Sequence, residues 1–135
     1  MSPAVEAARI TAITPQLRTT DLDASIGFYT GKLGFTLGFR WQDFYAGICA
    51  GEAEFHLKLV DAPDPSIDYV AQGDHVHLYF QAPDVEALAA EFRARGVTLI
   101  DGPVDRPWDT REIVLRDDQG HTLYFSQPLN QEESK

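Results

Sequence analysis

The sequence has one cysteine, few basic residues and no long hydrophobic run. Cys49 lies in the apolar run YAGICA, so the chain can form no internal disulfide, and we expect this thiol in the core. No segment approaches the roughly 18 apolar residues that a membrane helix needs, and the start MSPAVEAARI lacks the basic and apolar regions of a secretion signal. We therefore expect a cytoplasmic protein with no membrane partner.

Basic residues are outnumbered, because 21 Asp and Glu against 11 Lys and Arg give a net charge of −10 at pH 7. Such a charge repels phosphate backbones, which excludes nucleic acid as an expected partner. The acidity either serves only solubility or attracts a cationic ligand, and composition leaves both interpretations open.

Neither disorder nor several domains fits the composition. A chain of 135 residues with 44% hydrophobic residues, 10 Gly and 8 Pro has the size and content of one globular domain. We expect this domain to span residues 1–130, followed by a polar tail at 131–135.

An internal repeat divides the domain. Residues 21–37 (DLDASIGFYTGKLGFTL) match residues 84–99 (DVEALAAEFRARGVTL) at an offset of 63, which becomes 62 after one deletion. Each copy starts with an aspartate suited to cap a helix, and Gly34 and Gly96 stand where the helix should end in a left-handed residue. Each half of the chain therefore contributes one helix.

Extended runs surround each predicted helix, one before it and three after it. The runs are 13–20, 35–41, 44–50 and 53–60 in a first module (about 10–60), and 75–83, 97–101, 111–117 and 121–126 in a second (about 75–126). Residues 61–74, rich in Pro and Asp, form the expected linker. The pattern predicts an α+β fold of two βαβββ modules whose eight strands form a curved mixed sheet with the helices on its convex side.

Alternation along the strands predicts which side chains avoid the helices, because successive residues point to opposite faces. The apolar residues of 53–60 and 75–80 should pack beneath the helices. The concave face should then carry the polar residues of the same runs: Glu54, His56, Lys58, His75, His77 and Tyr79. Most lone histidines are hydrogen-bonded structural residues, but two on this face keep a ligand role open.

Three segments resemble the vicinal oxygen chelate superfamily of glyoxalases, bleomycin-resistance proteins and extradiol dioxygenases. They are TPQLRTTDLDASIGFYTGKLGF (14–35), HLYFQAPDVEALAAEFRARG (77–96) and LRDDQGHTLYF (115–125), the last similar to the family's D-P-x-G-N-x-x-E ending. The resemblance runs from about residue 13 to 125 and implies the paired-module fold. It leaves the activity open, because the superfamily contains isomerases, dioxygenases, drug-modifying enzymes and proteins that only bind.

The resemblance also places four inherited metal positions, at Thr14, His56, His77 and Tyr124. Only the two histidines are good ligands for a divalent ion, whereas catalytic sites generally use three protein ligands. We therefore expect no metal and no other cofactor. The alternative is a metal-dependent glyoxalase or dioxygenase-type lyase or oxidoreductase that uses His56 and His77. His121, after the turn DDQG, is expected to be a turn residue.

Segments 39–59 and 105–125 are similar to the bleomycin-resistance branch in particular. That resemblance implies a homodimer that sequesters a cationic aromatic antibiotic, for example a bleomycin-like one, in a cleft between the subunits. Stacking surface and negative charge are available at Trp41, Phe44 and Trp108, beside Asp43 and Asp109. Trp41 also continues the alternation of core positions, so a core location is equally consistent with the sequence.

Further ligand contacts are expected from one arginine and from face alternation. Arg111 either anchors the ligand or forms a surface ion pair near Asp109 and Glu112. Arg18 and Lys58, if they enter the cleft with Gln16 and Tyr79, would instead favour an anionic or neutral ligand. The expected ligand-binding set is Trp41, Phe44, His56, His77, Trp108, Arg111 and Tyr124.

Overall fold

The fold is taken from a computed structural model, which describes residues 9–129; the predicted polar tail lies outside this range. The first module contains β1 (Gln16–Thr19), α1 (Leu22–Gly27), the π-helical η2 (Phe28–Lys32), β2 (Thr36–Trp41), β3 (Tyr45–Ala50) and β4 (Ala53–Leu59). Then follow α2 (Ser66–Gln72), β5 (Leu78–Gln81), α3 (Val85–Ala94), β6 (Asp101–Arg106), β7 (Thr110–Arg116) and β8 (Thr122–Pro128).

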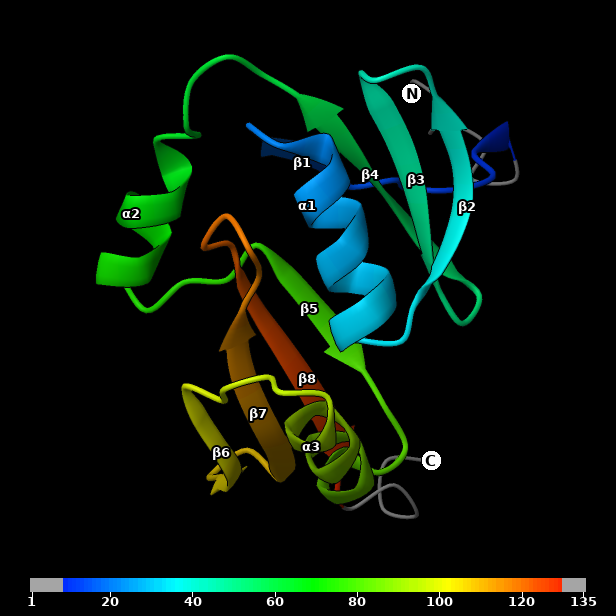
Figure 1. Cartoon of the computed structure of the whole chain (residues 1–135). Coiled ribbons are helices and arrows are strands. Elements are labelled where there is room, and N and C mark those ends of the chain that lie inside the picture. Colours follow the sequence, from blue (N-terminus) through cyan, green and yellow to red (C-terminus); the bar gives the residue numbers. More distant parts are fainter. Residues whose placement is uncertain (1–8, 130–135) are drawn as a thin grey trace, which may run out of the picture.

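The two modules have the same topology (Figure 1). The strand orders are β1-β4-β3-β2 and β5-β8-β7-β6, and in each sheet the first two neighbours run parallel while the others run antiparallel. The predicted α+β fold of paired βαβββ modules is thus confirmed. Its eight strands are divided into two four-stranded sheets, which we call sheet A (β1–β4) and sheet B (β5–β8).

Both predicted helix starts and both glycine ends are confirmed. A carboxylate oxygen of Asp21 accepts a hydrogen bond from the backbone N–H of Ala24 at 3.0 Å, and Asp84 caps α3 in the same way. Gly34 and Gly96 have φ angles of 74° and 87°, in the left-handed region that glycine tolerates best. These local signals depend on residues close in sequence, which is why they can be read without the fold.

One expectation about the strands was wrong, because the strand expected at 97–101 lies instead at Asp101–Arg106. The segment expected as the linker, 61–74, contains a short helix, α2, that the sequence did not predict. Strand β6 contains Pro103, which is tolerated because β6 is the edge strand of sheet B and pairs with one neighbour.

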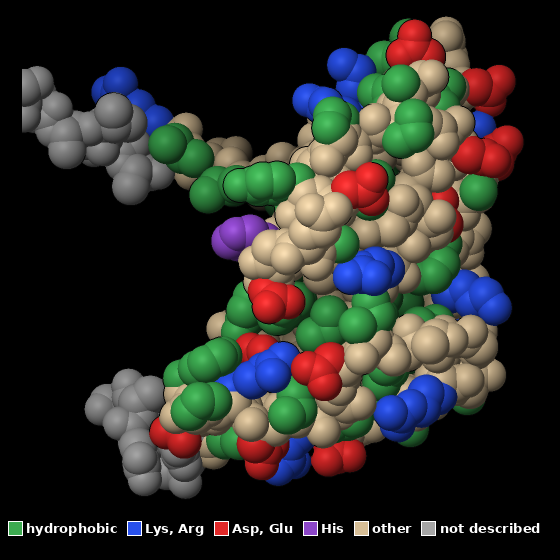
Figure 2. Space-filling model, turned by 90° about the vertical axis from the view of Figure 1, so that its left-hand side faces the viewer, with side chains coloured by type: hydrophobic (Ala, Val, Ile, Leu, Met, Phe, Trp, Pro, Cys, Tyr) green, Lys and Arg blue, Asp and Glu red, His purple; other side chains and the backbone are tan. Residues whose placement is uncertain are grey.

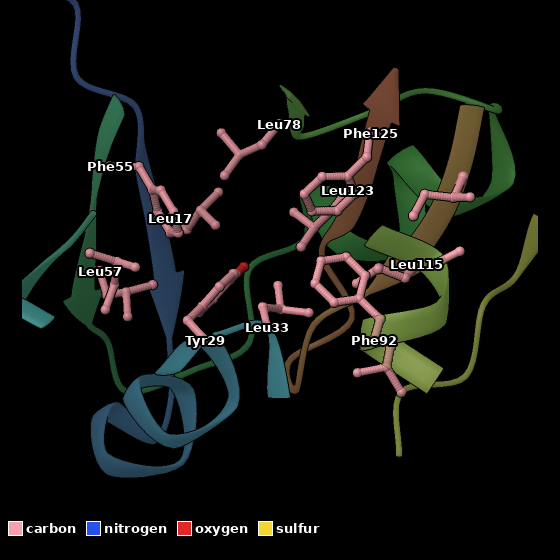
Figure 3. Packing of buried hydrophobic residues seen from close by; sticks show 14 of the residues in the cluster. Leu17, Tyr29, Leu33, Phe55, Leu57, Leu78, Phe92, Leu115, Leu123 and Phe125 are labelled. Carbon is pink, nitrogen blue, oxygen red and sulfur yellow. The ribbon is translucent and has the colours of Figure 1, made fainter. Parts of the chain in front are cut away.

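One hydrophobic core joins the two modules (Figure 3). Leu17 and Phe55 extend into it from sheet A, and Leu123 and Phe125 extend into it from sheet B. The π-helical segment adds Tyr29, which is fully buried. The opposite face of each sheet, which we call its outer face, therefore points away from the core.

Cys49 lies half-buried on the outer face of sheet A, not in the core as expected. None of the helices among residues 9–129 is long and apolar enough to cross a bilayer.

Candidate functional site

The outer face of sheet A carries a group of exposed aromatic side chains. Phe39 and Phe44 are each 40% exposed and Trp41 is 56% exposed, so Trp41 is a surface residue and the core interpretation is wrong for it. The rings of Trp41 and Phe44 meet edge to face at 6.1 Å, and the ammonium of Lys58 lies 5.9 Å from the Phe44 ring centre. This face therefore offers aromatic stacking surface at two of the residues expected to bind the ligand, Trp41 and Phe44.

Beside these rings runs a chain of hydrogen bonds. The side-chain amide of Gln16 donates to the hydroxyl of Tyr45 at 2.9 Å, and this hydroxyl lies 2.9 Å from Nδ1 of His56. Nε2 of His56 lies 2.9 Å from a carboxylate oxygen of Glu54. The ring of Phe39 packs edge to face on His56 at 5.3 Å, above Gly47, where a side chain would overlap it. His56 is thus held on both ring nitrogens.

A buried carboxylate organises the outer face of sheet B. Glu112 on β7 is 1% exposed and accepts hydrogen bonds from Tyr79 at 2.8 Å, from Nε of Arg106 at 2.9 Å and from Thr110 at 3.2 Å. Burial alone would raise the pKa of Glu112, but these hydrogen bonds outweigh it and hold the pKa below its usual value. The carboxylate of Glu112 is therefore charged, and its hydrogen bonds hold the side chains of Arg106 and Tyr79 in place.

Above Glu112 lies a cleft of about 380 Å³, which we call the sheet B cleft. Trp108, 63% exposed, and Tyr124 provide its aromatic surface. Its charged residues comprise three carboxylates and one guanidinium: Asp74, Asp101, Glu112 and Arg106. Two residues expected at the site therefore meet here in an environment of net negative charge.

A smaller cavity of about 130 Å³ continues this cleft beneath the end of α2. It shares Asp74, Asp101 and Tyr124 with the cleft and is also lined by Thr122. The hydroxyl of Thr122 is buried and has no hydrogen-bond partner among the described residues. An unpaired buried hydroxyl at the wall of a cavity is a group that a bound molecule can satisfy.

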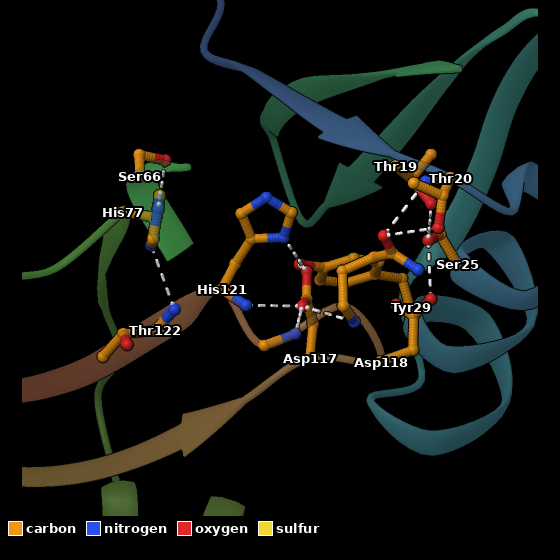
Figure 4. Close-up of polar contacts among 12 residues, drawn as sticks. Thr19, Thr20, Ser25, Tyr29, Ser66, His77, Asp117, Asp118, His121 and Thr122 are labelled. Carbon is orange, nitrogen blue, oxygen red and sulfur yellow. Dashed lines mark hydrogen bonds and ion pairs between the residues drawn. The ribbon is translucent and has the colours of Figure 1, made fainter. Parts of the chain in front are cut away.

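His77 lies at the bend just before β5, half-buried. Its Nδ1 accepts a 3.1 Å hydrogen bond from the backbone N–H of Thr122, and its Nε2 lies 3.1 Å from the hydroxyl of Ser66 on α2 (Figure 4). Its ring meets the ring of His121 edge to face at 4.8 Å. Burial and the neighbouring His121 lower the pKa of His77. His77 and His56 belong to different modules and make separate sets of contacts.

His121 was expected in a turn, but its side chain is fully buried. Its Nδ1 lies 2.8 Å from a carboxylate oxygen of Asp117, which also accepts a 2.6 Å hydrogen bond from the hydroxyl of Tyr29 (Figure 4). Burial alone would raise the pKa of Asp117, but the bonds from His121 and Tyr29 lower it. The arrangement joins the two modules and is closed to solvent.

Arg111 is occupied by carboxylates of its own module. Its Nε lies 2.7 Å from Asp105 on β6, and another nitrogen lies 3.8 Å from Glu86 on α3. The contact with Glu86 places this guanidinium on the helix side of sheet B, away from Trp108 and Tyr124. Asp43 is likewise paired, with Arg40 at 2.9 Å.

The structure therefore separates the expected residues into groups. Trp41, Phe44 and His56 share the outer face of sheet A, and Trp108 and Tyr124 share the sheet B cleft. Sequence reasoning missed the residues that organise these faces: Tyr45, Arg106, Glu112 and Asp74. Strand alternation could have found Tyr45 and Glu112, which lie at outer-face positions of β3 and β7.

Comparisons with known proteins agree with this architecture. Residues 9–125 match the family described as the "Glyoxalase/Bleomycin resistance protein/Dioxygenase superfamily". A protein of Mycolicibacterium smegmatis named only as uncharacterized is 36% identical over 114 residues, which is 84% of this chain and 90% of that protein.

Two solved structures have a similar fold. TnmS3, described as an antibiotic binding protein from Streptomyces sp. CB03234, has a TM-score of 0.65 and 25% identity over 87% of this chain and 97% of that chain. The bleomycin-binding protein of Streptomyces verticillus, solved with copper(II)-bleomycin, has a TM-score of 0.63 and 22% identity over 86% and 94% of the two chains. With the family match covering nearly all described residues, and with paired βαβββ modules present, this chain belongs to the glyoxalase/bleomycin resistance protein/dioxygenase superfamily.

Proposed function

We propose that this protein binds a small cationic aromatic molecule and does so without a metal ion. The observation that carries the proposal is the sheet B cleft, where Trp108 and Tyr124 share one cavity with three carboxylates and one guanidinium. A flat aromatic ligand gains free energy by stacking on an exposed indole, and a positive charge on it is attracted by the excess of carboxylates.

The cleft has anchors that are already in place before a ligand arrives. Glu112 fixes Arg106 and Tyr79 through its hydrogen bonds, and the ring of Tyr79 lies 6.2 Å from that of Tyr124. Asp74 takes part in no ion pair among residues 9–129, so its charge is available to a ligand. The tyrosine pair held by Glu112 and an available carboxylate reduce the ordering cost of binding.

A second copy of the chain would complete the site. In one chain the outer faces of sheet A and sheet B both point away from the shared core. Trp41 and Phe44 on one face and Trp108 on the other are therefore exposed to solvent. We infer a homodimer in which the outer face of sheet A in one copy covers the sheet B cleft of the other. The antibiotic-binding and bleomycin-binding proteins of similar fold support a natural product as the ligand.

A metal does not fit the four inherited positions. His56 is engaged on both ring nitrogens by Tyr45 and Glu54, and His77 accepts a backbone N–H on Nδ1. Thr14 and Tyr124 would supply a neutral hydroxyl and a phenol, which bind divalent ions weakly. Among residues 9–129, no group of three or more His, Cys, Asp or Glu side chains is placed to hold an ion. Stoichiometric Ni, Zn, Fe or Mn in purified protein, lost in His77→Ala, would overturn this proposal.

The ligand class can be tested with a panel of cationic aromatic compounds, metal-free bleomycin among them, and neutral analogues of the same shape. We expect thermal stabilisation and calorimetric heat from cationic members only. Asp74→Asn should weaken binding, whereas Asp68→Asn on the exposed side of α2 should not. Equal binding of neutral and cationic members, or equal effects of the two substitutions, would contradict the assignment.

A further inference from the structure

A second cavity of about 380 Å³ lies between the N-terminal segment and the two modules. Figure 2 shows the first described residues, with several hydrophobic side chains among them, extending from the body of the molecule. The cavity is lined by residues 12–15 of this segment, by residues 52–55 at the start of β4, and by residues 78–80 of β5. Both modules of a single chain therefore build it, and it contains no tryptophan.

The inner wall of this cavity is apolar and rigid. Phe55 is 3% exposed, and its ring lies 6.2 Å from that of Phe80. Phe35 packs against both rings, at 6.5 and 5.7 Å, and Leu78 is buried beside them. Because these side chains belong to the hydrophobic core, the wall is formed before any ligand binds. A small apolar or aromatic group can pack on it without reorganising the protein.

The rim of the cavity is acidic and lacks a positive partner. Glu52 and Glu54 line it, and no lysine, arginine or histidine does. Neither carboxylate forms an ion pair with a lysine or arginine among residues 9–129. Some carboxylates elsewhere on the surface do have such partners, as Asp43 has Arg40 and Asp105 has Arg111, whereas Asp74 in the sheet B cleft has none among the described residues. The cavity therefore holds uncompensated negative charge next to an apolar wall.

The hydrogen-bond chain on sheet A ends at Glu54, which lines this cavity, and it shows whether Glu54 donates or accepts hydrogen bonds. A carboxylate such as Glu54 only accepts, so Nε2 of His56 carries the proton of the 2.9 Å bond between them. In the neutral ring Nδ1 is then the acceptor, and the Tyr45 hydroxyl, which itself accepts from the amide of Gln16, donates to it. Glu54 is thus an acceptor at the end of the chain, and its other carboxylate oxygen has no hydrogen-bond partner among the described residues.

Tyr79 also contributes to the lining of this cavity, but its side chain points to the outer face of sheet B, where its hydroxyl donates to Glu112. The charged groups offered to a ligand here are therefore the carboxylates of Glu52 and Glu54. Because a carboxylate accepts hydrogen bonds and donates none, a neutral acceptor such as a ketone would meet their lone pairs. A group with several N–H donors and a positive charge matches them.

We propose that this cavity binds a small organic ammonium ion, with its amine on Glu54 and Glu52 and a short apolar or aromatic body against Phe55 and Phe80. The site is distinct from the sheet B cleft and is complete within one chain. It therefore depends neither on a dimer nor on Trp108.

Calorimetric titration of the full chain with 2-phenylethylamine at pH 7.5 tests this inference, with 2-phenylethanol and 3-phenylpropionate as neutral and anionic analogues. We expect saturable binding of the amine, weaker binding of the alcohol and none of the acid. Glu54→Gln keeps an acceptor for His56 but removes the charge, and it should weaken amine binding about fivefold. The matched control is Glu86→Gln on α3, which should leave binding unchanged.

Two further variants separate this site from the sheet B cleft. Ala53→Phe places a ring in the cavity from a solvent-exposed position and should abolish amine binding while thermal unfolding confirms the fold. Trp108→Ala should leave amine binding unchanged. Loss of binding in Trp108→Ala but not in Glu54→Gln would assign the amine to the sheet B cleft and overturn this inference without touching the proposed function. Equal affinity for amine and alcohol, or no amine binding, would overturn it as well.

Discussion

The hydroxyl of Tyr29 donates a 2.6 Å hydrogen bond to the carboxylate of Asp117, and both side chains are buried. The two residues are 88 positions apart, in the π-helical segment of the first module and at the end of β7 in the second. The hydroxyl of Ser25 makes a parallel 2.7 Å bond to Asp118. Two consecutive helical elements of the first module, α1 and η2, are therefore both bound to the turn that follows β7 in the second module.

We predict that Tyr29→Phe destabilises the protein by about 1–3 kcal/mol, because the substitution removes one donor from a buried carboxylate and leaves no space for water. Urea denaturation measures the change. Tyr69→Phe is the matched control, since Tyr69 is 73% exposed and should alter stability by less than about 0.5 kcal/mol. Equal stability of the two variants would show that His121 and the backbone satisfy Asp117 without Tyr29.

Stability should decrease as the pH falls from about 7.5 to 5.5. The pKa of His77 in the folded protein is lowered from 6.5 by burial and by His121, so the unfolded chain binds the proton more tightly. The stabilisation is present above the unfolded pKa and is lost as the pH falls from there through the lower pKa of the folded state. Protonation of Nδ1 would also break the bond from the Thr122 N–H.

Urea midpoints measured across this pH range check the prediction. His77→Asn retains an acceptor near the position of Nδ1 but cannot be protonated, so its stability should depend less on pH. His75→Gln is the exposed control and should retain the wild-type slope. A slope unchanged in His77→Asn would assign the pH dependence to another group.

Gly102→Ala should be far more destabilising than Gly51→Ala. Both glycines have positive φ angles, 87° and 62°. A side chain at Gly51 would meet nothing, so the substitution costs only backbone strain of about 1 kcal/mol. A side chain at Gly102 would overlap the carbonyl oxygen of Glu112, which adds about 1–3 kcal/mol of overpacking. Denaturation midpoints of the two variants give the comparison, and equal losses would contradict the packing of β6 on β7.

Trp108→Ala should weaken the binding of a cationic aromatic ligand of the sheet B cleft, such as metal-free bleomycin, about three- to tenfold, the loss expected from one aromatic contact. Because Trp108 is 63% exposed, the substitution should leave the unfolding midpoint nearly unchanged. Titration calorimetry provides the affinity. Unaltered affinity in this variant would place the ligand away from the sheet B cleft.

Local features were readable from the sequence. The repeat, the aspartate caps and the terminal glycines depend on neighbouring residues, and all appear in the structure. Alternation in β4 also placed His56 and Lys58 correctly on the face opposite Phe55, because a regular strand preserves its period.

Features that depend on distant contacts were not readable. His77 stands before the first residue of β5, where alternation no longer applies, and its partners come from α2 and β8. The linker gave no apolar period from which α2 could be predicted. The pairing of Arg111 with Asp105 could not be predicted without knowing where β6 lies. Gly102 and Pro103 are unfavourable in strands, so the sequence did not indicate a strand at these residues.

We propose that stacking and charge bind a cationic aromatic ligand here without a metal. The decisive measurement is calorimetric titration of protein dialysed against a chelator, with metal-free bleomycin and the cationic aromatic panel. We expect saturable heat from at least one cationic compound, unchanged by the chelator. No heat from any compound, or heat only after Ni, Zn, Fe or Mn is restored, would show that metal-independent binding of this ligand class is wrong.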